Sequence, residues 1–322
     1  MKKVLMILAA ICMTMAANAK ILRVSNVSGS SAPYATFNDA QDAAEIGDTI
    51  MFDGSSNSYK SITIKKTLVI IGPGYFFDIN NISDEDLLPA KFTSVNVNKE
   101  AEGTVIEGLY ITSELETRAN RTIVKRCRII DESWTGRGLT LRARNCVAHQ
   151  NIVSKINSGA FYVDDYYDQI TNNLILGRVE SIGGSYIAYN TFIESISSTH
   201  QDELDNCFDD VINSTIEKNI ISRTNIGGNG WNNTNTNTFI DNYVYGPEAD
   251  KQLIEWSLYL TDKAIKEATN DLTSSGYGAF ANDSPYVLSG IPAGPVIQDL
   301  IIPTTVEMGS MLNVTIKVGV QP

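Results

Sequence analysis

The sequence predicts an all-β fold, a solenoid of the parallel β-helix type, from three observations. A phrase made of an apolar residue, an Asn three positions on and a second apolar residue two further recurs along the chain. The segments between the phrases are rich in Asn, Gly and Ser and lack the apolar period of a helix. The Asn residues lie 17 to 29 residues apart, which is a solenoid spacing. The phrase occurs at Ala148/Asn151/Val153, Ile170/Asn173/Ile175, Ile187/Asn190/Phe192, Ile216/Asn219/Ile221 and Phe239/Asn242/Val244.

Stacking explains why the phrase repeats. Strands of about five residues without intervening helices cannot be joined by helical crossovers, but they can stack as turns of a coil, with equivalent residues about 4.8 Å apart. An inward Asn at each bend would bond the backbone of its own turn and the Asn residues above and below. We therefore assign the Asn column a structural role. Earlier turns fit with Cys127 and Leu109 in its place.

Residues 1–19 have the features of a secretory signal peptide. Lys2 and Lys3 precede an apolar run, and Ala17-Asn18-Ala19 offers a cleavage site. We expect an exported protein of the periplasm, the outer cell surface or the extracellular medium, with no membrane span. The predicted domains are a β-helix over residues 20–246 and a C-terminal coil and β tail over residues 247–322.

Charge and cysteine content exclude several partners. Losing Lys2 and Lys3 changes the formal charge from −12 to about −14, which disfavours nucleic acid and anionic lipid surfaces. Cys127, Cys146 and Cys207 remain after cleavage, so at most one disulfide is possible. His149 and His200 are too few for a zinc site. We expect a monomer.

The N-terminal elements follow in order. Residues 36–46 predict a short amphipathic helix with Thr36 as its cap and Gly47 as its end. Strands follow in GDTIMFDG, SITIKKTLVIIG and FTSVNV. A helix across the first coil would cover the open edge of the solenoid.

The chain resembles the right-handed parallel β-helix superfamily typified by pectate lyases. Its members often begin with an A-x-x-G-D-T-I phrase, which Ala44, Gly47, Asp48, Thr49 and Ile50 match, and the resemblance covers about residues 21–246. It implies the fold and right-handed coiling. It does not choose an activity, because the superfamily contains lyases, glycoside hydrolases, esterases, tailspikes and adhesins.

The C-terminal residues break the pattern. Residues 247–272 read as helix, as a strand near 253–260, or as a mixture, and Val314, Ile316, Val318 and Val320 alternate as a strand does. The intervening SPYVLSGIP phrase is similar to the tails of exported, polysaccharide-associated proteins of gut-type Gram-negative bacteria. We expect this tail to cover the open end of the coil or to be the remnant of a β module.

Candidate functional residues come from aligning the turns. The aligned column contains Arg142 and Arg144, then Asp164 and Asp165, Gly183 and Gly184, Asp209 and Asp210, and finally Trp231. Two coils between the Asp pairs would separate their carboxylates by about 9 to 10 Å, near the separation in inverting glycosidases.

The other residues of this predicted site have supporting roles. Arg142 is a candidate base for a lyase, Arg144 would bind a uronic acid and Trp231 would stack on a sugar. His200 is a further catalytic candidate. Asp202, Glu203 and Asp205 are candidate calcium ligands, with calcium as the one cofactor considered.

Each assignment has a structural alternative. Asp-Asp pairs commonly bond their own backbone in turns, and Arg142 and Arg144 alternate with apolar residues as solvated strand residues do. Of the polygalacturonase phrases, Asn-Thr-Asp, Gly-His-Gly and Arg-Ile-Lys are missing and only Asp-Asp is present.

Two functions remain open. The first is binding, with or without cleavage, of a pectin-like or other polysaccharide on an outer groove. The enzyme would then be a polysaccharide lyase or an inverting glycoside hydrolase. The second is a non-catalytic, adhesin-like surface rod.

Overall fold

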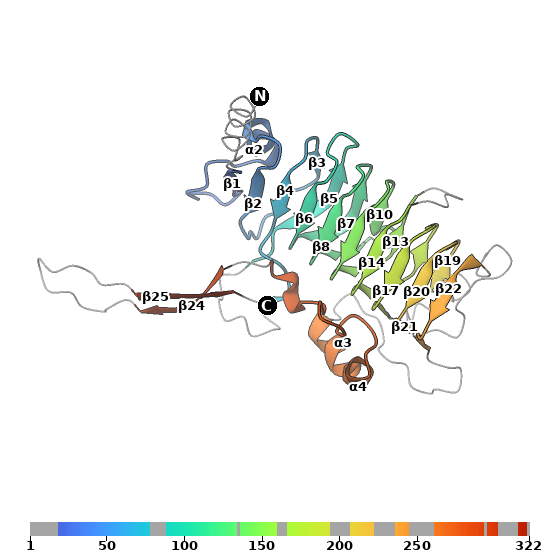
Figure 1. Ribbon diagram of the computed structural model, residues 1–322. Helices are drawn as coiled ribbons and strands as arrows, with labels where there is room; N and C mark the ends of the chain where they lie inside the picture. Colours follow the sequence, from blue (N-terminus) through green and yellow to red (C-terminus); the bar gives the residue numbers. More distant parts are fainter. Residues whose placement is uncertain are drawn as a thin grey trace, which may run out of the picture.

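The computed structural model describes residues 19–77, 88–133, 136–159, 166–193, 207–221, 236–244, 261–292, 295–301 and 315–320. This part of the chain is mostly β, with two large parallel sheets and few helices (Figure 1). The predicted signal peptide lies almost wholly outside the described residues.

The ten-stranded sheet is parallel throughout. In spatial order its strands are β1 (Ile21–Val24), β2 (Thr49–Phe52), β4 (Val69–Ile71), β6 (Val105–Glu107), β8 (Ile123–Lys125), β11 (Val147–His149), β14 (Gln169–Thr171), β17 (Tyr186–Ala188), β20 (Thr215–Glu217) and β22 (Thr238–Ile240).

The thirteen-stranded sheet contains the remaining parallel strands. They are β3 (Ile62–Ile64), β5 (Lys91–Val97), β7 (Tyr110–Thr117), β9 (Arg128–Ile129), β10 (Leu139–Leu141), β12 (Ile152–Val153), β13 (Ile156–Asn157), β15 (Leu174–Ile175), β16 (Val179–Glu180), β18 (Thr191–Phe192), β19 (Phe208–Asp209), β21 (Ile220–Ile221) and β23 (Tyr243–Val244). Strands β2, β3, β4 and β5 confirm the strands predicted before residue 98.

The chain visits the two sheets in turn, so each pass stacks on the one before. We call each pass a rung. Strands β11, β12 and β13 form one rung, and β14, β15 and β16 form the next, paired in register with it. The inward residue of each strand in the first sheet is buried, as in the column Ile70, Ile106, Val124, Ala148, Ile170, Ile187 and Ile216. This arrangement fits a parallel β-helix.

The Asn column is a continuous buried ladder, as predicted. The Asn190 side-chain oxygen accepts hydrogen bonds from the backbone N–H of Asn173 (2.9 Å) and from its amide (3.0 Å). The Asn190 amide donates to the Ile170 carbonyl (2.8 Å) and to Asn219 Oδ1 (3.0 Å). Asn151, Asn173 and Asn219 are equally buried and repeat the pattern. Most of the backbone partners belong to the neighbouring rungs, a wider reach than the own-turn bonds that were expected.

Each ladder Asn follows a residue in the left-handed backbone region. Arg126, Gln150, Asn172, Tyr189, Lys218 and Asp241 occupy this position with φ between 44° and 58°. Such a conformation costs a non-Gly residue roughly 1–2 kcal/mol. The sharp bend that it makes directs the next amide inward, where the ladder hydrogen bonds offset this cost.

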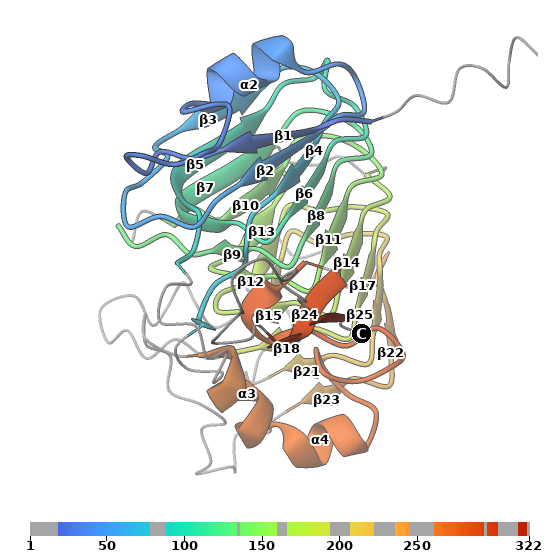
Figure 2. The ribbon, with the colours of Figure 1, turned by 90° about the vertical axis from the view of Figure 1, so that its left-hand side faces the viewer.

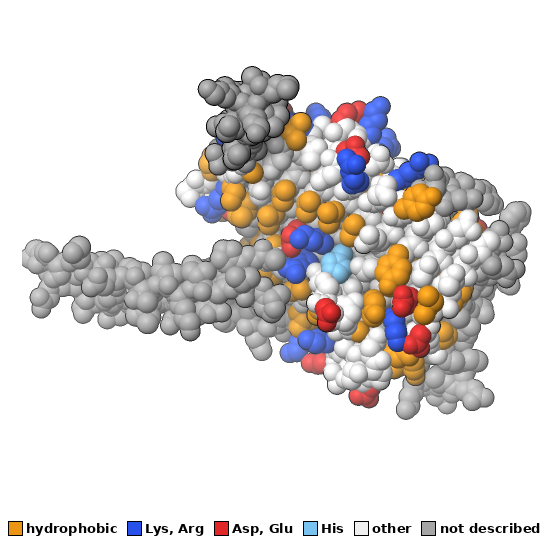
Figure 3. Space-filling view, viewed as in Figure 1, with side chains coloured by type: hydrophobic (Ala, Val, Ile, Leu, Met, Phe, Trp, Pro, Cys, Tyr) orange, Lys and Arg blue, Asp and Glu red, His pale blue; other side chains and the backbone are white. Residues whose placement is uncertain are grey.

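Outward residues also stack along the ten-stranded sheet. Val69, Val105, Ile123 and Val147 are paired on neighbouring strands. Figure 3 shows apolar side chains in a row across this face. Cross-strand pairs of β-branched residues stabilise a sheet, so the column reinforces the early rungs.

Helix α2 (Phe37–Ala43) confirms the predicted N-terminal helix and ends earlier than expected. Thr36 caps it by accepting a hydrogen bond from the Asp39 N–H. Phe37 and Ala40 are buried, and the helix packs on β1, β2 and β3 at the first end of the stack (Figures 1 and 2). It therefore covers the apolar edge that the first rung would otherwise expose.

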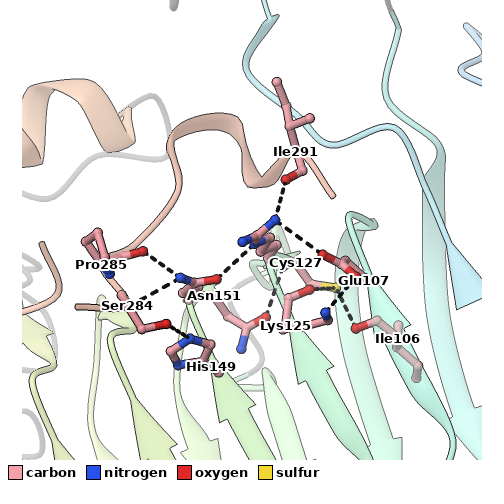
Figure 4. Close-up of polar contacts among 11 residues, drawn as sticks. Ile106, Glu107, Lys125, Cys127, His149, Asn151, Ser284, Pro285 and Ile291 are labelled. Carbon is pink, nitrogen blue, oxygen red and sulfur yellow. Dashed lines mark hydrogen bonds and ion pairs between the residues drawn. The ribbon is translucent and has the colours of Figure 1, made fainter. Parts of the chain in front are cut away.

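The C-terminal region runs along the side of the stack and not only at its end. It contains α3 (Asp262–Ala268), α4 (Asn270–Ser274) and the 3₁₀ turn η3 (Leu288–Gly290). Residues 277–291, here called the strap, contact successive left-handed turns. Tyr277 bonds Asp241, the Gly278 N–H donates to the Lys218 carbonyl, Asn172 bonds Ala279 and Ala281, Gln150 bonds Ser284 and Pro285, and Arg126 bonds Ile291 (Figure 4).

An apolar cluster holds the strap against the thirteen-stranded sheet. Phe280 and Tyr286 pack with the outward residues Ile152 and Leu174. The tail was expected to cover the end of the coil, but the strap instead crosses its rungs lengthwise. Strands β24 (Pro295–Ile301) and β25 (Thr315–Val320) form an antiparallel pair, and β25 confirms the predicted alternating strand.

A second buried polar column lies at the other bend of the rungs. Asp168 accepts a hydrogen bond from the Cys146 N–H (2.7 Å), and its N–H donates to Ser185 Oγ (3.0 Å). Its other carboxylate oxygen has no partner among the described residues. Burial raises the pKa of Asp168 to about 8.

Two further features bear on expectations from the sequence. Cys127, Cys146 and Cys207 are buried free thiols, so no disulfide joins them. Within the described ranges, no helix has the length and apolarity needed to cross a bilayer.

Replacing Asn190 by Ala tests the ladder. It leaves the Asn173 N–H and the Ile170 carbonyl buried without their partner. We expect a loss of about 3–5 kcal/mol in the free energy of unfolding, since each unsatisfied buried group costs about 1–3 kcal/mol. Urea denaturation measures it, and Asn57→Ala on the exposed surface is the control. Equal effects of the two substitutions would contradict the role of the ladder.

Replacing Asp168 by Asn tests the buried carboxyl. Its folded pKa, about 8, is above the ordinary 3.8, so the folded state keeps a proton that the unfolded state loses as pH rises between these values. The free energy of unfolding therefore falls by up to about 1.4 kcal/mol per pH unit in this window. We expect Asp168→Asn to be more stable than wild type at pH 8, with a difference that shrinks toward pH 4. Denaturation at several pH values measures this.

Candidate functional site

The candidate site is the outer face of the thirteen-stranded sheet, where β7, β10, β13, β16 and β19 lie side by side. Their registered outward residues form what we call the polar row: Glu116, Thr140, Asn157, Glu180 and Asp209. The residues before them point inward and are buried: Leu115, Leu139, Ile156, Val179 and Phe208. Alternation along each short strand therefore puts one polar side chain per rung on this face.

Two cations and two carboxylates form a network at the later rungs. Glu180 Oε2 lies 3.2 Å from Lys155 Nζ and 2.8 Å from Arg178 Nε, and Arg178 Nη1 lies 3.4 Å from Asp209 Oδ2. Burial raises the pKa of Glu180, but the ion pairs with Arg178 and Lys155 outweigh it and lower the pKa overall. Glu180 is thus held ionised, which suits binding better than proton donation.

Arg142 lies on the same face at an earlier rung. Its Nε is 2.9 Å from Glu116 Oε2, and its Nη1 donates to the Gly159 carbonyl (2.8 Å). Arg118 Nε bonds the other Glu116 oxygen (2.6 Å). One carboxylate thus faces two guanidinium groups, so this part of the face has an excess of positive charge.

The other predicted residues in the described part of the chain lie close by. Arg144 is exposed in the loop between β10 and β11, where its N–H donates to Asn120 Oδ1. Asp210 follows β19 in a left-handed turn with φ of 50°, consistent with the turn alternative. Its pKa is raised by burial and by the neighbouring Asp209 and Glu180. The remaining predicted residues lie outside the described residues: Asp164, Asp165, His200, Asp202, Glu203, Asp205 and Trp231.

The predicted column is wrong in register. Asp209 pairs with Glu180, whereas Gly183 pairs with Ile212 on the following rung. The polar row lies 10 or 11 residues before the next ladder position on four rungs but 16 before it at Asn157, because the segment after β13 is longer. Variable outward segments therefore defeat any fixed count from the Asn.

Four residues of the site were not found from the sequence: Glu116, Lys155, Arg178 and Glu180. A signal was present, since Lys155-Ile156-Asn157 and Arg178-Val179-Glu180 share a cation–apolar–polar phrase just after the Asn phrase. The two strands pair residue for residue.

The spacing of the carboxylates differs from the expected value. Glu180 and Asp209 belong to adjacent rungs, so their backbones are about 4.8 Å apart. That is closer to the separation in retaining glycosidases than to the wide inverting one. Both carboxylates contact Arg178, however, and the arrangement is best suited to bind ionic or hydroxyl groups along a straight face.

Comparisons with protein-family models, curated proteins and solved structures gave no match. Within the described ranges, no group of three or more His, Cys, Asp or Glu is placed to hold a metal ion.

Arg178→Met tests the charge network. It removes the cation shared by Glu180 and Asp209, so we expect a loss of about 1–2 kcal/mol in unfolding free energy at pH 7. Because the pKa of Glu180 is lowered in the folded state, this contribution exists above the unfolded pKa and disappears as the pH falls through the folded one. Denaturation at pH 7 and pH 3 measures it. Arg118→Met, at an exposed pair, is the control, and an equal loss in both variants would contradict the network.

Proposed function

We propose that the protein is an exported right-handed parallel β-helix that binds an acidic polysaccharide, of the uronic-acid-containing type, along the polar row. The leader-like residues 1–19 support export, and the resemblance of residues 21–246 supports the handedness. The observation that carries the binding proposal is the series of cations and carboxylates on successive rungs of one straight face.

The chemistry of the row matches such a ligand. Arg142 and Arg178 offer guanidinium groups that can bind carboxylates in a bidentate manner, and Asn157, Glu180 and Asp209 can accept or donate hydrogen bonds to sugar hydroxyls. The regular rung spacing presents these groups at intervals of about 4.8 Å, so an extended chain can contact several rungs at once. Multiple weak contacts then add up to useful affinity.

Cleavage is the second candidate within this proposal. Asp210 favours it, because its pKa is raised and it lies beside Asp209 at the end of the row. Calcium held by Asp202, Glu203 and Asp205 would fit a lyase. The competing proposal is a non-catalytic display rod, which the left-handed turn at Asp210 and the extensive pairing of the charges favour.

Binding to a panel of soluble polysaccharides tests the proposal. We expect polygalacturonate to bind and neutral glucans to bind less, with an affinity that falls as salt increases. Arg142→Met combined with Lys155→Met should weaken binding at least tenfold, because both cations face the row. Arg23→Met is the matched control: Arg23 pairs with Asp53 on the ten-stranded sheet, much as Arg142 pairs with Glu116.

Product analysis of the same mixtures separates the alternatives. New reducing ends would indicate hydrolysis, and unsaturated products absorbing in the ultraviolet would indicate elimination. Loss of either activity in EGTA would indicate calcium. No binding to any polysaccharide would rule out the proposal and leave the display rod.

A further inference from the structure

A second chemical constellation lies on the ten-stranded sheet, away from the polar row. His149 lies between two hydroxyl groups, with Nε2 3.0 Å from Ser284 Oγ and Nδ1 2.8 Å from Thr171 Oγ1 (Figure 4). The three residues come from the strap, β11 and β14. A hydroxyl, an imidazole and a group that orients the imidazole are the parts of an activated serine.

The fold positions each of these residues. His149 and Thr171 are registered partners on adjacent strands. The Ser284 N–H donates to Asn282 Oδ1 (2.7 Å), and Gln150 Nε2 donates to the carbonyls of Ser284 and Pro285. Ser284 itself is exposed, so a substrate can reach its hydroxyl from solvent.

The electrostatics favour a neutral imidazole. Burial lowers the pKa of His149, and Arg126 and Lys125 lower it further. Lys125 is the registered neighbour of His149 on β8. Lys125 and Arg126 share the Glu107 carboxylate, at 2.9 and 3.5 Å, so the cluster has an excess of positive charge. If Nδ1 carries the proton and donates it to Thr171, Nε2 is free to accept the Ser284 proton.

We propose that Ser284 and His149 form an acyl-transfer site that hydrolyses O-acyl esters displayed on an exposed polymer. Ser284 Oγ attacks the acyl carbon while its proton passes to His149 Nε2. The bond to the leaving alkoxide breaks as that oxygen takes the proton from His149. Water then attacks the acyl-serine with His149 again as base, which releases the acid and restores the Ser284 hydroxyl.

The remaining groups have supporting roles. Thr171 is a positioning residue, because it contacts the imidazole and not the reacting atoms. The positive charge of Lys125 and Arg126 favours the oxyanion that forms during attack. An exposed serine suits an ester on a large chain better than an enclosed small molecule. This site is independent of the polar row, so its test can fail or succeed whatever the outcome for polysaccharide binding.

Labelling with a fluorophosphonate, followed by peptide mass spectrometry, tests the proposal on the full chain. We expect covalent modification at Ser284 in wild type, and at least a hundredfold slower modification in His149→Gln, which lacks the base. The labelling rate should rise with pH to a plateau, with its midpoint below 6.5, since the pKa of His149 is lowered from that value. Hydrolysis of p-nitrophenyl acetate should follow the same pattern.

Controls separate catalysis from docking of the strap. Ser284→Ala should abolish labelling and hydrolysis, whereas Ser275→Ala should leave both unchanged, because Ser275 is an exposed serine whose hydroxyl donates only to the Asp271 carbonyl. Circular dichroism and thermal melting check that each variant is folded. Unlabelled Ser284 in the folded wild type, or equal labelling of wild type and His149→Gln, would overturn the proposal and leave the contact as a docking interaction.

Discussion

The buried Asn ladder is the interaction on which the rest of the structure depends. A bend in every rung leaves backbone N–H and C=O groups inside the molecule, where an unsatisfied group costs about 1–3 kcal/mol. Each amide joins the backbone of neighbouring rungs and the next amide, so one residue type satisfies several groups at once. This requirement fixes the register of the ladder, and with it the position of every strand that leaves a bend.

That fixed register also determines which outward side chains become neighbours. Glu180 and Asp209 are 29 residues apart, yet they share Arg178 because their strands are adjacent rungs. His149 and Thr171 are brought together in the same way on the other sheet. Surface chemistry in this protein is therefore a product of rung alignment, and a charge contributes to a site only through its position relative to the ladder.

The sequence predicted the ladder and the sheets well but the site poorly, and the reason is physical. Burial constrains the inward residues, so the Asn phrase, the terminal helix and the early strands could be recognised from their patterns. The outward segments between strands face no such constraint and vary in length, so counting from Asn190 or Asn219 misplaced Gly183 relative to Asp209. The route of the strap could not be foreseen, because its partners are single side chains of distant turns, such as Gln150 and Asn172.

The strap has a consequence for how the molecule comes apart. In a stack whose rungs touch only their neighbours, terminal turns can fray one by one, and stability is a sum of local terms. Here a single stretch of chain spans from Asp241, near the last rung, to Arg126 and Tyr75, near the first ones. Releasing any one turn then disturbs a segment shared by many others, which converts a ladder of semi-independent steps into a body that melts as a unit.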